Sequence, residues 1–399
     1  MAIDSLISFL GKSVTGYRNA TYHFDDGYQV SVPYFGLGLV QKIKPKRLIL
    51  VGTPSSMWDV FFADQNNQDD ALLSELFEAS HSGTVDENLL SKCSDVLEEQ
   101  LGCEVVSILI EFSKDEREQV ALLAKLSEVI ADNETLAIDV THSFRHLPML
   151  AMVASRFLEK TRNISTESIY YGALEMTDPI TKLTPVIELN GLLKMLDWVD
   201  ALASFEKSGD FSDFTSLYER EGLNQLAGLL EQASFYERTN QIAQARKPLQ
   251  AFLAQEANAS QSPIIDLFSP GIRKRVEWAQ EAKISERQSS VAMYYLDKGD
   301  YLRAATLGYE AVLTKIIQQQ PGNSDVQNYS VREKIKNQIR DKSIVLSPEE
   351  LASLKNLSNT RNALAHGSRS TDGTIQKAMS TEKELRDFLA EALAQLNKI

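Results

Sequence analysis

The stretch Thr135–Met149, "TLAIDVTHSFRHLPM", decides how the first half of the chain folds. It begins as an apolar run of the kind that forms a strand covered on both faces of a parallel sheet. The run passes directly into polar side chains, and Pro148 then opens a helix. In an open α/β sheet, ligands bind beyond the carboxyl ends of the strands, where loops and helix N-termini present backbone donors. The stretch therefore predicts a doubly wound domain with a binding site at this strand end.

The same alternation of strand and helix patterns extends over residues 1–188. Nearly continuous apolar, β-branched runs dominate the further strand candidates, and helical spacing follows them, for example at Asp86–Leu101 and Asp115–Ala131. Asp26-Gly27 lies between two alternating runs and predicts a hairpin within the first crossover. The fold class is therefore α/β and Rossmann-like. The further strand candidates are Ser5–Gly11, Arg47–Thr53, Glu104–Phe112 and Ser168–Leu174.

Beyond this region the pattern changes to helices only. From Leu192 to Ile399 apolar residues recur at i, i+3, i+4 and i+7, and no stretch predicts a strand convincingly. Breaker residues at Ala257–Pro263 and Leu267–Gly271 predict a joint between two helical parts. We therefore expect an α/β domain over 1–188, an all-α connector over 189–284 and a C-terminal helical bundle over 285–399.

Composition limits the class of protein. The 399 residues carry a net charge of −14, which argues against a broad basic surface that grips nucleic acid. No window offers the roughly 18 apolar residues of a membrane span, and the N-terminus lacks a basic leader, so we expect a cytoplasmic protein without membrane contact. Cys93 and Cys103 form neither a disulfide framework nor a zinc pair, and the five histidines match no metal-ligand spacing. We therefore expect no metal and no cofactor.

Two more strand ends carry polar or glycine-rich residues, at Phe9–Tyr17 and Val51–Asp59. At the first strand end, the hydroxyls of Thr141 and Ser143, the guanidinium of Arg145 and the N-terminus of the following helix together can bind phosphate or ribose. A strand-to-helix turn capped by hydroxyls explains the same residues without any ligand. The chain lacks a Walker loop and the G-x-G-x-x-G pattern, so an ATPase or a dinucleotide-dependent dehydrogenase is disfavoured.

A second candidate site lies at Thr360–Gly367, "TRNALAHG". Arg361 and His366 lie five positions apart, about 140° around a regular helix, and do not share a face. His366 before a helix-ending glycine is also a favourable C-terminal charge without further role. If two copies met across a two-fold axis, both pairs could converge on one phosphodiester. Histidine would then move the proton, arginine would stabilise the phosphorane charge, and Asn362 would orient either group, without a metal.

With both features together, the chain resembles the CRISPR-associated CARF–HEPN proteins, type III accessory ribonucleases activated by cyclic oligoadenylate. The resemblance rests on "LISFLG", with the tyrosine and "ATY" that follow it, on "DVTHSFRHLPM", and on "RNALAH", which fits the R-x(4 to 6)-H motif of HEPN nucleases. It covers most of the chain. The helix pattern "GDYLRAATLGYEAVLTKII" is similar to the long first helix of a HEPN bundle, with Glu310 as a lesser candidate facing the site.

The resemblance implies a CARF sensor domain, a helical connector and a HEPN ribonuclease domain that work as a homodimer or a higher oligomer. One cyclic oligoadenylate, expected to be cyclic tetra-adenylate, would lie across the CARF two-fold axis. Single-stranded RNA would be cut without a metal by a composite site, leaving 2′,3′-cyclic phosphate or 3′-phosphate and 5′-hydroxyl ends. The implied catalytic residues are Arg361, Asn362 and His366. The implied ligand contacts are Ser8, Leu10, Gly11, Lys12, Ser13, Thr53, Asp139, Thr141, His142, Ser143, Phe144 and Arg145.

Two other functions remain open at this stage. The chain could be a non-catalytic sensor whose helical part binds a partner or regulates transcription. It could also degrade its own cyclic activator in the sensor pocket, with His142 or Thr141 taking part.

Overall fold

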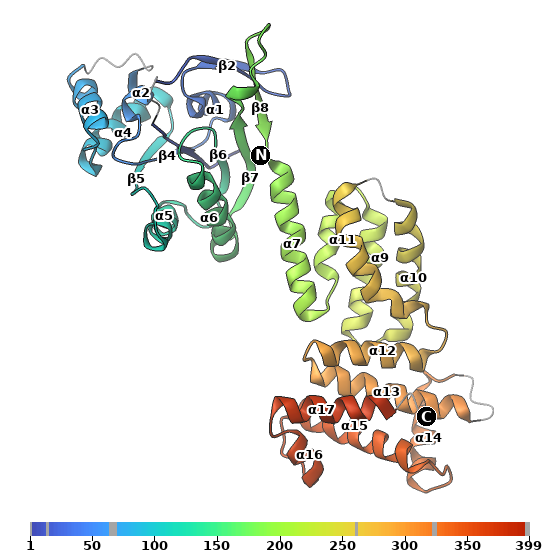
Figure 1. Cartoon of the computed structure of the whole chain (residues 1–399). Coiled ribbons are helices and arrows are strands. Elements are labelled where there is room, and N and C mark those ends of the chain that lie inside the picture. Colours follow the sequence, from blue (N-terminus) through green and yellow to red (C-terminus); the bar gives the residue numbers. More distant parts are fainter. Residues whose placement is uncertain (1, 13–15, 64–69, 260–261, 321–324, 396–399) are drawn as a thin grey trace. The chain divides into compact units, whose positions relative to one another are not determined.

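The computed structural model describes the chain except for residues 1, 13–15, 64–69, 260–261, 321–324 and 396–399. Its contacts divide the chain into two compact units, Met1–Lys194 and Met195–Ile399 (Figure 1). Helix α7 (Asn190–Ser208) begins in the first unit and continues in the second. The expected subdivision of the helical half into connector and terminal bundle stays a prediction.

The first unit is built on an eight-stranded sheet of order β3-β2-β8-β7-β6-β1-β4-β5. The five consecutive strands β5, β4, β1, β6 and β7 run parallel to one another. This order, with β1 in the middle and the chain winding first one way and then the other, is that of a doubly wound domain. All five predicted strands are present, as β1 (Ser5–Phe9), β4 (Arg47–Gly52), β5 (Glu104–Leu109), β6 (Thr135–Asp139) and β7 (Ser165–Gly172).

Helices cover both faces of the sheet, which explains the apolar strands. In β1, Leu6 belongs to one buried apolar cluster and Ile7 and Phe9 to another, as the alternation of side chains along a strand requires. The first cluster includes α1 (Phe35–Ile43), α3 (Asp70–Ser82) and α4 (Glu87–Leu101), and the second includes α5 (Glu116–Val129) and α6 (His146–Arg162). The short α2 (Trp58–Ala63) follows β4. Asp86 and Asp115 cap α4 and α5 by accepting the N–H groups of Leu89 and Glu118.

The sheet is mixed, which the sequence pattern did not predict. The hairpin at Asp26-Gly27 is confirmed, because β2 (Ala20–His23) and β3 (Gln29–Val32) pair antiparallel. An unpredicted strand, β8 (Leu183–Glu188), pairs antiparallel to β7 and parallel to β2. Its alternating burial and Pro185 distinguish it from the continuous apolar runs of the buried strands. The short 3₁₀ helix η1 (Leu174–Met176) lies in the connection between β7 and β8.

The second unit is mostly helical, and its described residues contain no strand. Its later helices α12, α13, α15 and α17 pack on one another (Figure 1). None of the helices described here is long and apolar enough to cross a membrane. The elements are η2 (Ser212–Phe214), α8 (Thr215–Arg220), α9 (Asn224–Arg238), α10 (Ile242–Ala259), α11 (Pro263–Val276), η3 (Glu277–Gln280), α12 (Ile284–Asp297), α13 (Tyr301–Gln319), α14 (Tyr329–Arg340), α15 (Pro348–His366), α16 (Gly373–Ala378) and α17 (Glu382–Ala394).

One predicted break in this unit is present and the other is wrong. The break at Ala257–Pro263 lies between α10 and α11, with residues 260–261 outside the description. The break at Leu267–Gly271 does not occur, because α11 continues through Pro270. Proline costs a helix one backbone hydrogen bond. The buried positions Ile265, Ile272 and Val276 pack α11 into the core, and tertiary packing outweighs that local cost.

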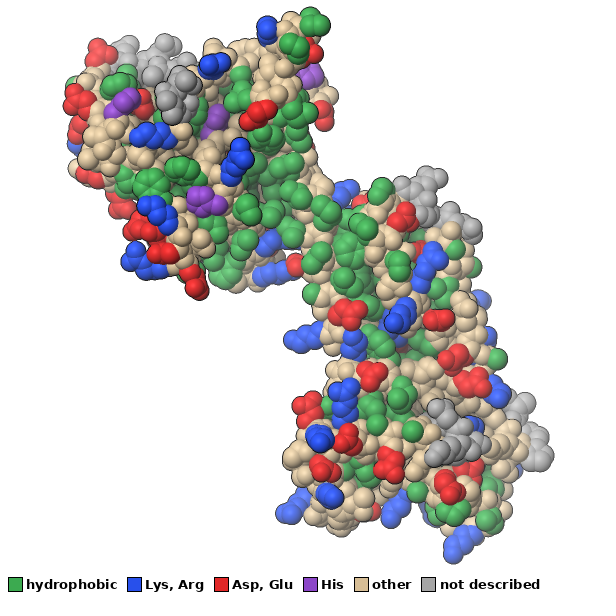
Figure 2. Space-filling view, viewed as in Figure 1, with side chains coloured by type: hydrophobic (Ala, Val, Ile, Leu, Met, Phe, Trp, Pro, Cys, Tyr) green, Lys and Arg blue, Asp and Glu red, His purple; other side chains and the backbone are tan. Residues whose placement is uncertain are grey.

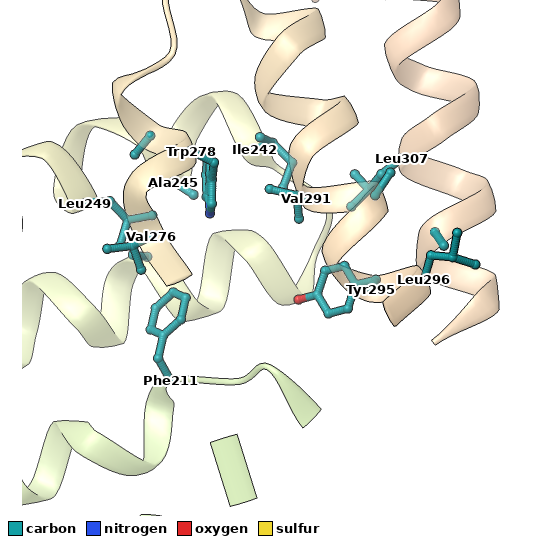
Figure 3. Packing of buried hydrophobic residues seen from close by; sticks show 14 of the residues in the cluster. Phe211, Ile242, Ala245, Leu249, Val276, Trp278, Val291, Tyr295, Leu296 and Leu307 are labelled. Atoms are coloured by element: carbon teal, nitrogen blue, oxygen red, sulfur yellow. The ribbon is translucent and has the colours of Figure 1, made fainter. Parts of the chain in front are cut away.

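The core of the second unit joins residues from α7 through α17 in one cluster. Figure 3 shows part of it, with Phe211, Val276, Trp278 and Tyr295 around a common centre. A buried ion pair between Arg275 and Glu237 lies in this core, and the Tyr295 hydroxyl donates to Glu237 Oε1 over 2.8 Å. Burying a charged pair requires such added hydrogen bonds, because both groups lose water.

Candidate functional sites

The first candidate site lies where the chain reverses its winding direction. Strands β1 and β6 are neighbours, with Ser8 opposite Asp139, and β4 lies on the other side of β1. After the β2–β3 hairpin, the chain adds β4 and then β5 on one side of β1, whereas β6 and β7 extend the sheet on the other side. Ligands of open α/β sheets bind at such a switch point, outside the carboxyl ends of the strands. The three polar strand ends of the sequence therefore meet at the expected edge.

A network of hydrogen-bonded, buried polar groups lies beneath this edge of the sheet. The Ser8 hydroxyl donates to Asp139 Oδ2 over 2.6 Å and lies 3.0 Å from the Tyr34 hydroxyl, which donates to the Phe9 carbonyl over 2.6 Å. The Thr141 backbone N–H donates to Asp139 Oδ1 over 2.9 Å. Burial raises the pKa of Asp139 to about 6, although the hydrogen bonds from Ser8 and Thr141 act in the opposite direction.

The loops above this network interlock through backbone contacts. Gly11 donates its N–H to the Tyr17 hydroxyl over 2.9 Å, and its carbonyl accepts from Met57 N–H over 2.9 Å. A Cβ at Gly11 would lie 2.7 Å from Ser143 N and 2.9 Å from Ser143 Cα, so only glycine fits without moving backbone. Ser143 itself has φ of 106°, a conformation that costs about 1–3 kcal/mol for a side-chain-bearing residue. Such strain is retained where the surroundings fix the backbone, and here they fix it beside Gly11.

The predicted ligand contacts fall into two groups at this edge. Ser8, Leu10, Thr53, Asp139 and His142 are buried beneath it, together with Gly11. The half-buried Thr141 and Ser143 and the exposed Lys12, Phe144 and Arg145 form its surface. The structure brings this second group, with its two positive charges, to the start of α6. Ser13 lies outside the described residues.

His142 is packed among tyrosines. Its ring centroid lies 4.6 Å from that of Tyr17 and 4.8 Å from that of Tyr34, and its Nε2 accepts from Phe35 N–H over 3.3 Å. Burial lowers the pKa of His142 to about 4, so the ring is neutral at pH 7. With Nε2 as an acceptor, the proton resides on Nδ1. In this arrangement His142 supports the fold of the strand ends.

The second candidate site is carried by α15. Ser347 begins this helix with a capping box in which Ser347 and Glu350 bond each other's backbone N–H groups, and Gly367, at φ of 58°, ends it. Arg361 and His366 both lie within the helix, as the motif requires. Five residues correspond to about 7.5 Å along a regular helix and about 140° around it. One helix therefore presents the two side chains in different directions.

The Arg361 guanidinium is held in place by two neutral groups. Asn362 Oδ1 accepts from Arg361 Nε over 3.3 Å and from Nη2 over 3.0 Å. The guanidinium carbon lies 4.6 Å from the centroid of the Tyr309 ring on α13. Asn362 and His366 are exposed, and Arg361 is half-buried.

A glycine on α13 packs closely against side chains of both α15 and α17 at this point. A Cβ at Gly308 would lie 2.4 Å from Leu393 Cδ2 and 3.3 Å from Leu357 Cδ2. Leu357 precedes Arg361 by one helical turn, and Gly308 precedes Tyr309 in the chain. The close packing therefore sets the aromatic ring against the guanidinium.

Glu310, the lesser candidate, is engaged elsewhere. It forms an ion pair with Arg332 of α14, whose Nη1 also donates to the Val326 carbonyl over 2.8 Å and to Thr314 Oγ1 over 3.2 Å. This cluster connects α13 to α14. Over the part of the chain that the structure describes, no group of three or more His, Cys, Asp or Glu side chains could hold a metal ion.

Comparison with known proteins identifies the first unit. Residues 5–175 match the family model described as "CRISPR system endoribonuclease Csx1, CARF domain". The curated "CRISPR-associated protein MJ1674" of Methanocaldococcus jannaschii is 25% identical over 406 aligned residues, which cover 94% of this chain. Residues 5–175 are therefore similar to a CARF domain, and the chain as a whole is similar to a CRISPR-associated protein. It spans 62% of the length of MJ1674.

The matched residues of the CARF domain include all three strand ends of the switch point, whereas Arg361, Asn362 and His366 lie outside them. A solved structure, Enterococcus italicus Csm6 bound to cyclic hexa-2′-fluoro-hexa-dAMP, aligns with 100% of this chain and 93% of its own. Its TM-score is 0.38 and its sequence identity is 11%, and a similarity this low supports no conclusion about fold or function. The second unit is mostly helical, and its assignment as a HEPN domain is a proposal.

The sequence did not identify the aromatic residues at either site. Tyr34 lies more than 100 residues before Asp139, and Tyr309 lies more than 50 before Arg361. Both occur in apolar patterns that are sufficiently explained by packing. The glycine before Tyr309, in "LGYEA", was the one sequence signal of a close contact between helices. Its meaning became clear only when the structure showed which helices pack there.

The buried carboxyl of the CARF domain predicts a pH-dependent stability. Because the pKa of Asp139 is raised in the folded state, its contribution is greatest below pH 4 and is lost as pH rises through about 6. We expect Asp139→Asn to gain up to about 3 kcal/mol of unfolding free energy relative to wild type over this interval. An amide can still accept from Thr141 N–H and donates to Ser8 instead. Denaturant unfolding of both proteins at several pH values measures the difference.

The other titrating groups around Asp139 are present in both wild type and Asp139→Asn, so their contributions drop out of the difference in unfolding free energy. His142 acts in the opposite direction, losing stability as pH falls, while the raised pKa values of Tyr17, Tyr22 and Tyr34 keep those tyrosines protonated. The exposed Asp95→Asn serves as the control and should give a difference independent of pH. A pH-independent difference for Asp139→Asn as well would contradict the prediction.

Proposed function

We propose that this protein is an endoribonuclease of CRISPR defence, in which a cyclic oligoadenylate bound by the CARF domain activates RNA cleavage by a HEPN site in the helical unit. The observation that carries the nuclease assignment is the geometry at α15. Arg361 is held on Tyr309 and by Asn362, and His366 is exposed on the same helix. In phosphodiester cleavage, an arginine fixed by neutral groups can stabilise the developing negative charge, and an exposed histidine can transfer the proton.

The cleavage chemistry requires only side chains. A neutral His366 takes the proton from a ribose 2′-hydroxyl, whose oxygen attacks the adjacent phosphorus. Arg361 stabilises the negative charge that builds on the phosphoryl oxygens. The protonated histidine then gives this proton to the leaving 5′-oxygen, so that the P–O5′ bond breaks and a 2′,3′-cyclic phosphate and a 5′-hydroxyl result. Because the two side chains project about 140° apart from one helix, a composite of two protomers is the arrangement in which both reach one phosphate.

At the CARF domain, Lys12 and Arg145 would meet the phosphates of the activator, and Thr141 and Ser143 its riboses. These residues lie at the switch point of the sheet, where the ligands of open α/β sheets bind. Cyclic tetra-adenylate is the ring that we propose. Its binding must favour one arrangement of the helical dimer over another, because a ligand with equal affinity for both would change nothing.

The partner that we propose is a second copy of this chain, docked through α6. Met149, Val153 and Phe157 follow one another at four-residue intervals on this helix and are 66%, 59% and 44% exposed. Figure 2 shows hydrophobic side chains gathered on this face of the first unit. An apolar stripe on a helix next to the ligand edge suits a two-fold contact, which would place two copies of that edge around one symmetric ring.

An RNA cleavage assay tests the proposed function. We expect single-stranded RNA to be cut in the presence of cyclic tetra-adenylate, in excess EDTA as well as without it, and the products to carry 2′,3′-cyclic phosphate or 3′-phosphate ends. Cyclic tri- and hexa-adenylate serve as ring-size controls. Activity lost on chelation would contradict the metal-free mechanism. Binding of the ring without cleavage of any RNA would instead support the non-catalytic sensor.

A further inference from the structure

The contact between Arg361 and Tyr309 joins two different helices. The Tyr309 side chain is buried, with 7% exposed, and its ring lies against the Arg361 guanidinium. A guanidinium within about 6 Å of a ring centroid is attracted by the negative face of the ring. The guanidinium carbon lies over the ring, while Nε and Nη2 donate to Asn362 Oδ1. A guanidinium carries five N–H donors, so these two contacts leave donors that can bind a phosphate.

Neutral partners hold Arg361 without cancelling its charge. On neighbouring helices, Arg332 pairs with Glu310 and Arg303 pairs with Asp300 at 3.0 Å. A carboxylate in such a pair fixes the arginine but also offsets its positive charge. Arg361, by contrast, contacts the Tyr309 ring and the Asn362 amide oxygen. They restrict the side chain while its full charge stays available to an anion.

We infer that Tyr309 is a positioning residue for RNA cleavage, which sets the orientation of Arg361 toward the scissile phosphate. The inference rests on the proposed function and extends it to a residue outside the R-x4-H motif. Tyr309 acts through Arg361 and need not touch RNA. Because Arg361 would act mainly on charge that develops in the transition state, loss of the ring should lower kcat more than it raises KM.

Three substitutions test this role in the full-length protein with its activator. We expect Tyr309→Leu to lower kcat about tenfold, the size of effect that a partly desolvated cation–π contact can have, with KM for RNA changed less than threefold. Tyr309→Phe keeps the ring face and should stay within about twofold of wild type. Tyr301→Leu is the matched control, since Tyr301 lies on the same helix and bonds Glu382 Oε1 over 2.7 Å instead.

Stability and chemistry can be separated. Thermal unfolding shows whether each variant is folded, and Tyr309→Met, which fills a core gap of similar size without a ring, replaces the leucine variant if that protein unfolds. Wild-type kcat in folded Tyr309→Leu would overturn the inference, and so would an equal loss in Tyr309→Phe, because packing or the hydroxyl would then be the cause. Cleavage that persists in Arg361→Ala would instead show that the proposed nuclease site is wrong.

Discussion

Replacing His366 by alanine is expected to reduce RNA cleavage by about two to four orders of magnitude, below detection in an ordinary assay. The histidine is the side chain of the α15 motif that can accept and donate a proton. Without it, Arg361 can still bind phosphate, but the 2′-hydroxyl has no base to accept its proton. Cleavage of fluorescent RNA with saturating cyclic tetra-adenylate measures the change.

The same substitution should leave the first unit unaffected. His366 is exposed at the end of its helix, so its removal costs little packing. Binding of radiolabelled cyclic tetra-adenylate should therefore match wild type. His81→Ala provides the control, because His81 is an exposed histidine near the end of α3 and should not affect cleavage. Unchanged cleavage in His366→Ala would remove the basis for assigning the nuclease site to α15.

Placing a carboxylate on α6 by Val153→Glu is expected to abolish dimer formation. In the proposed dimer this position is buried between two copies, so two like charges would face each other without water. Activator binding and RNA cleavage should both fall by at least about 100-fold, because each site is then half of a composite. Analytical ultracentrifugation measures the oligomeric state, and the same samples are tested for cleavage.

A second valine gives a closely matched control for this experiment. Val120 on α5 is 58% exposed, against 59% for Val153, and both lie on helices of the CARF domain. Val120→Glu should keep the dimer and its activity. If Val153→Glu stays dimeric and active, the two copies meet through another surface and α6 is not the interface.

Much of the CARF domain could be predicted from the sequence because its signals are local. Strands buried on both faces have nearly continuous apolar runs, as four of the five candidates do, and all five candidates became strands with a parallel neighbour. The hairpin at Asp26-Gly27 and the helices expected from Asp86 and Asp115 were readable for the same reason, since a turn or a helical pattern depends on nearby residues. Pairing partners are not local, so β8 and the mixed character of the sheet were missed.

At the candidate sites, the sequence by itself determined which polar residues follow the strands and which helix carries Arg361 and His366. Only the tertiary structure decided which of them are buried, that His142 packs on two tyrosines, and that Pro270 is tolerated inside α11. It also placed Tyr309 against Arg361, through a helix contact that Gly308 permits. The physical reason is that burial and charge orientation depend on side chains brought together from distant positions, which no pattern along the chain encodes.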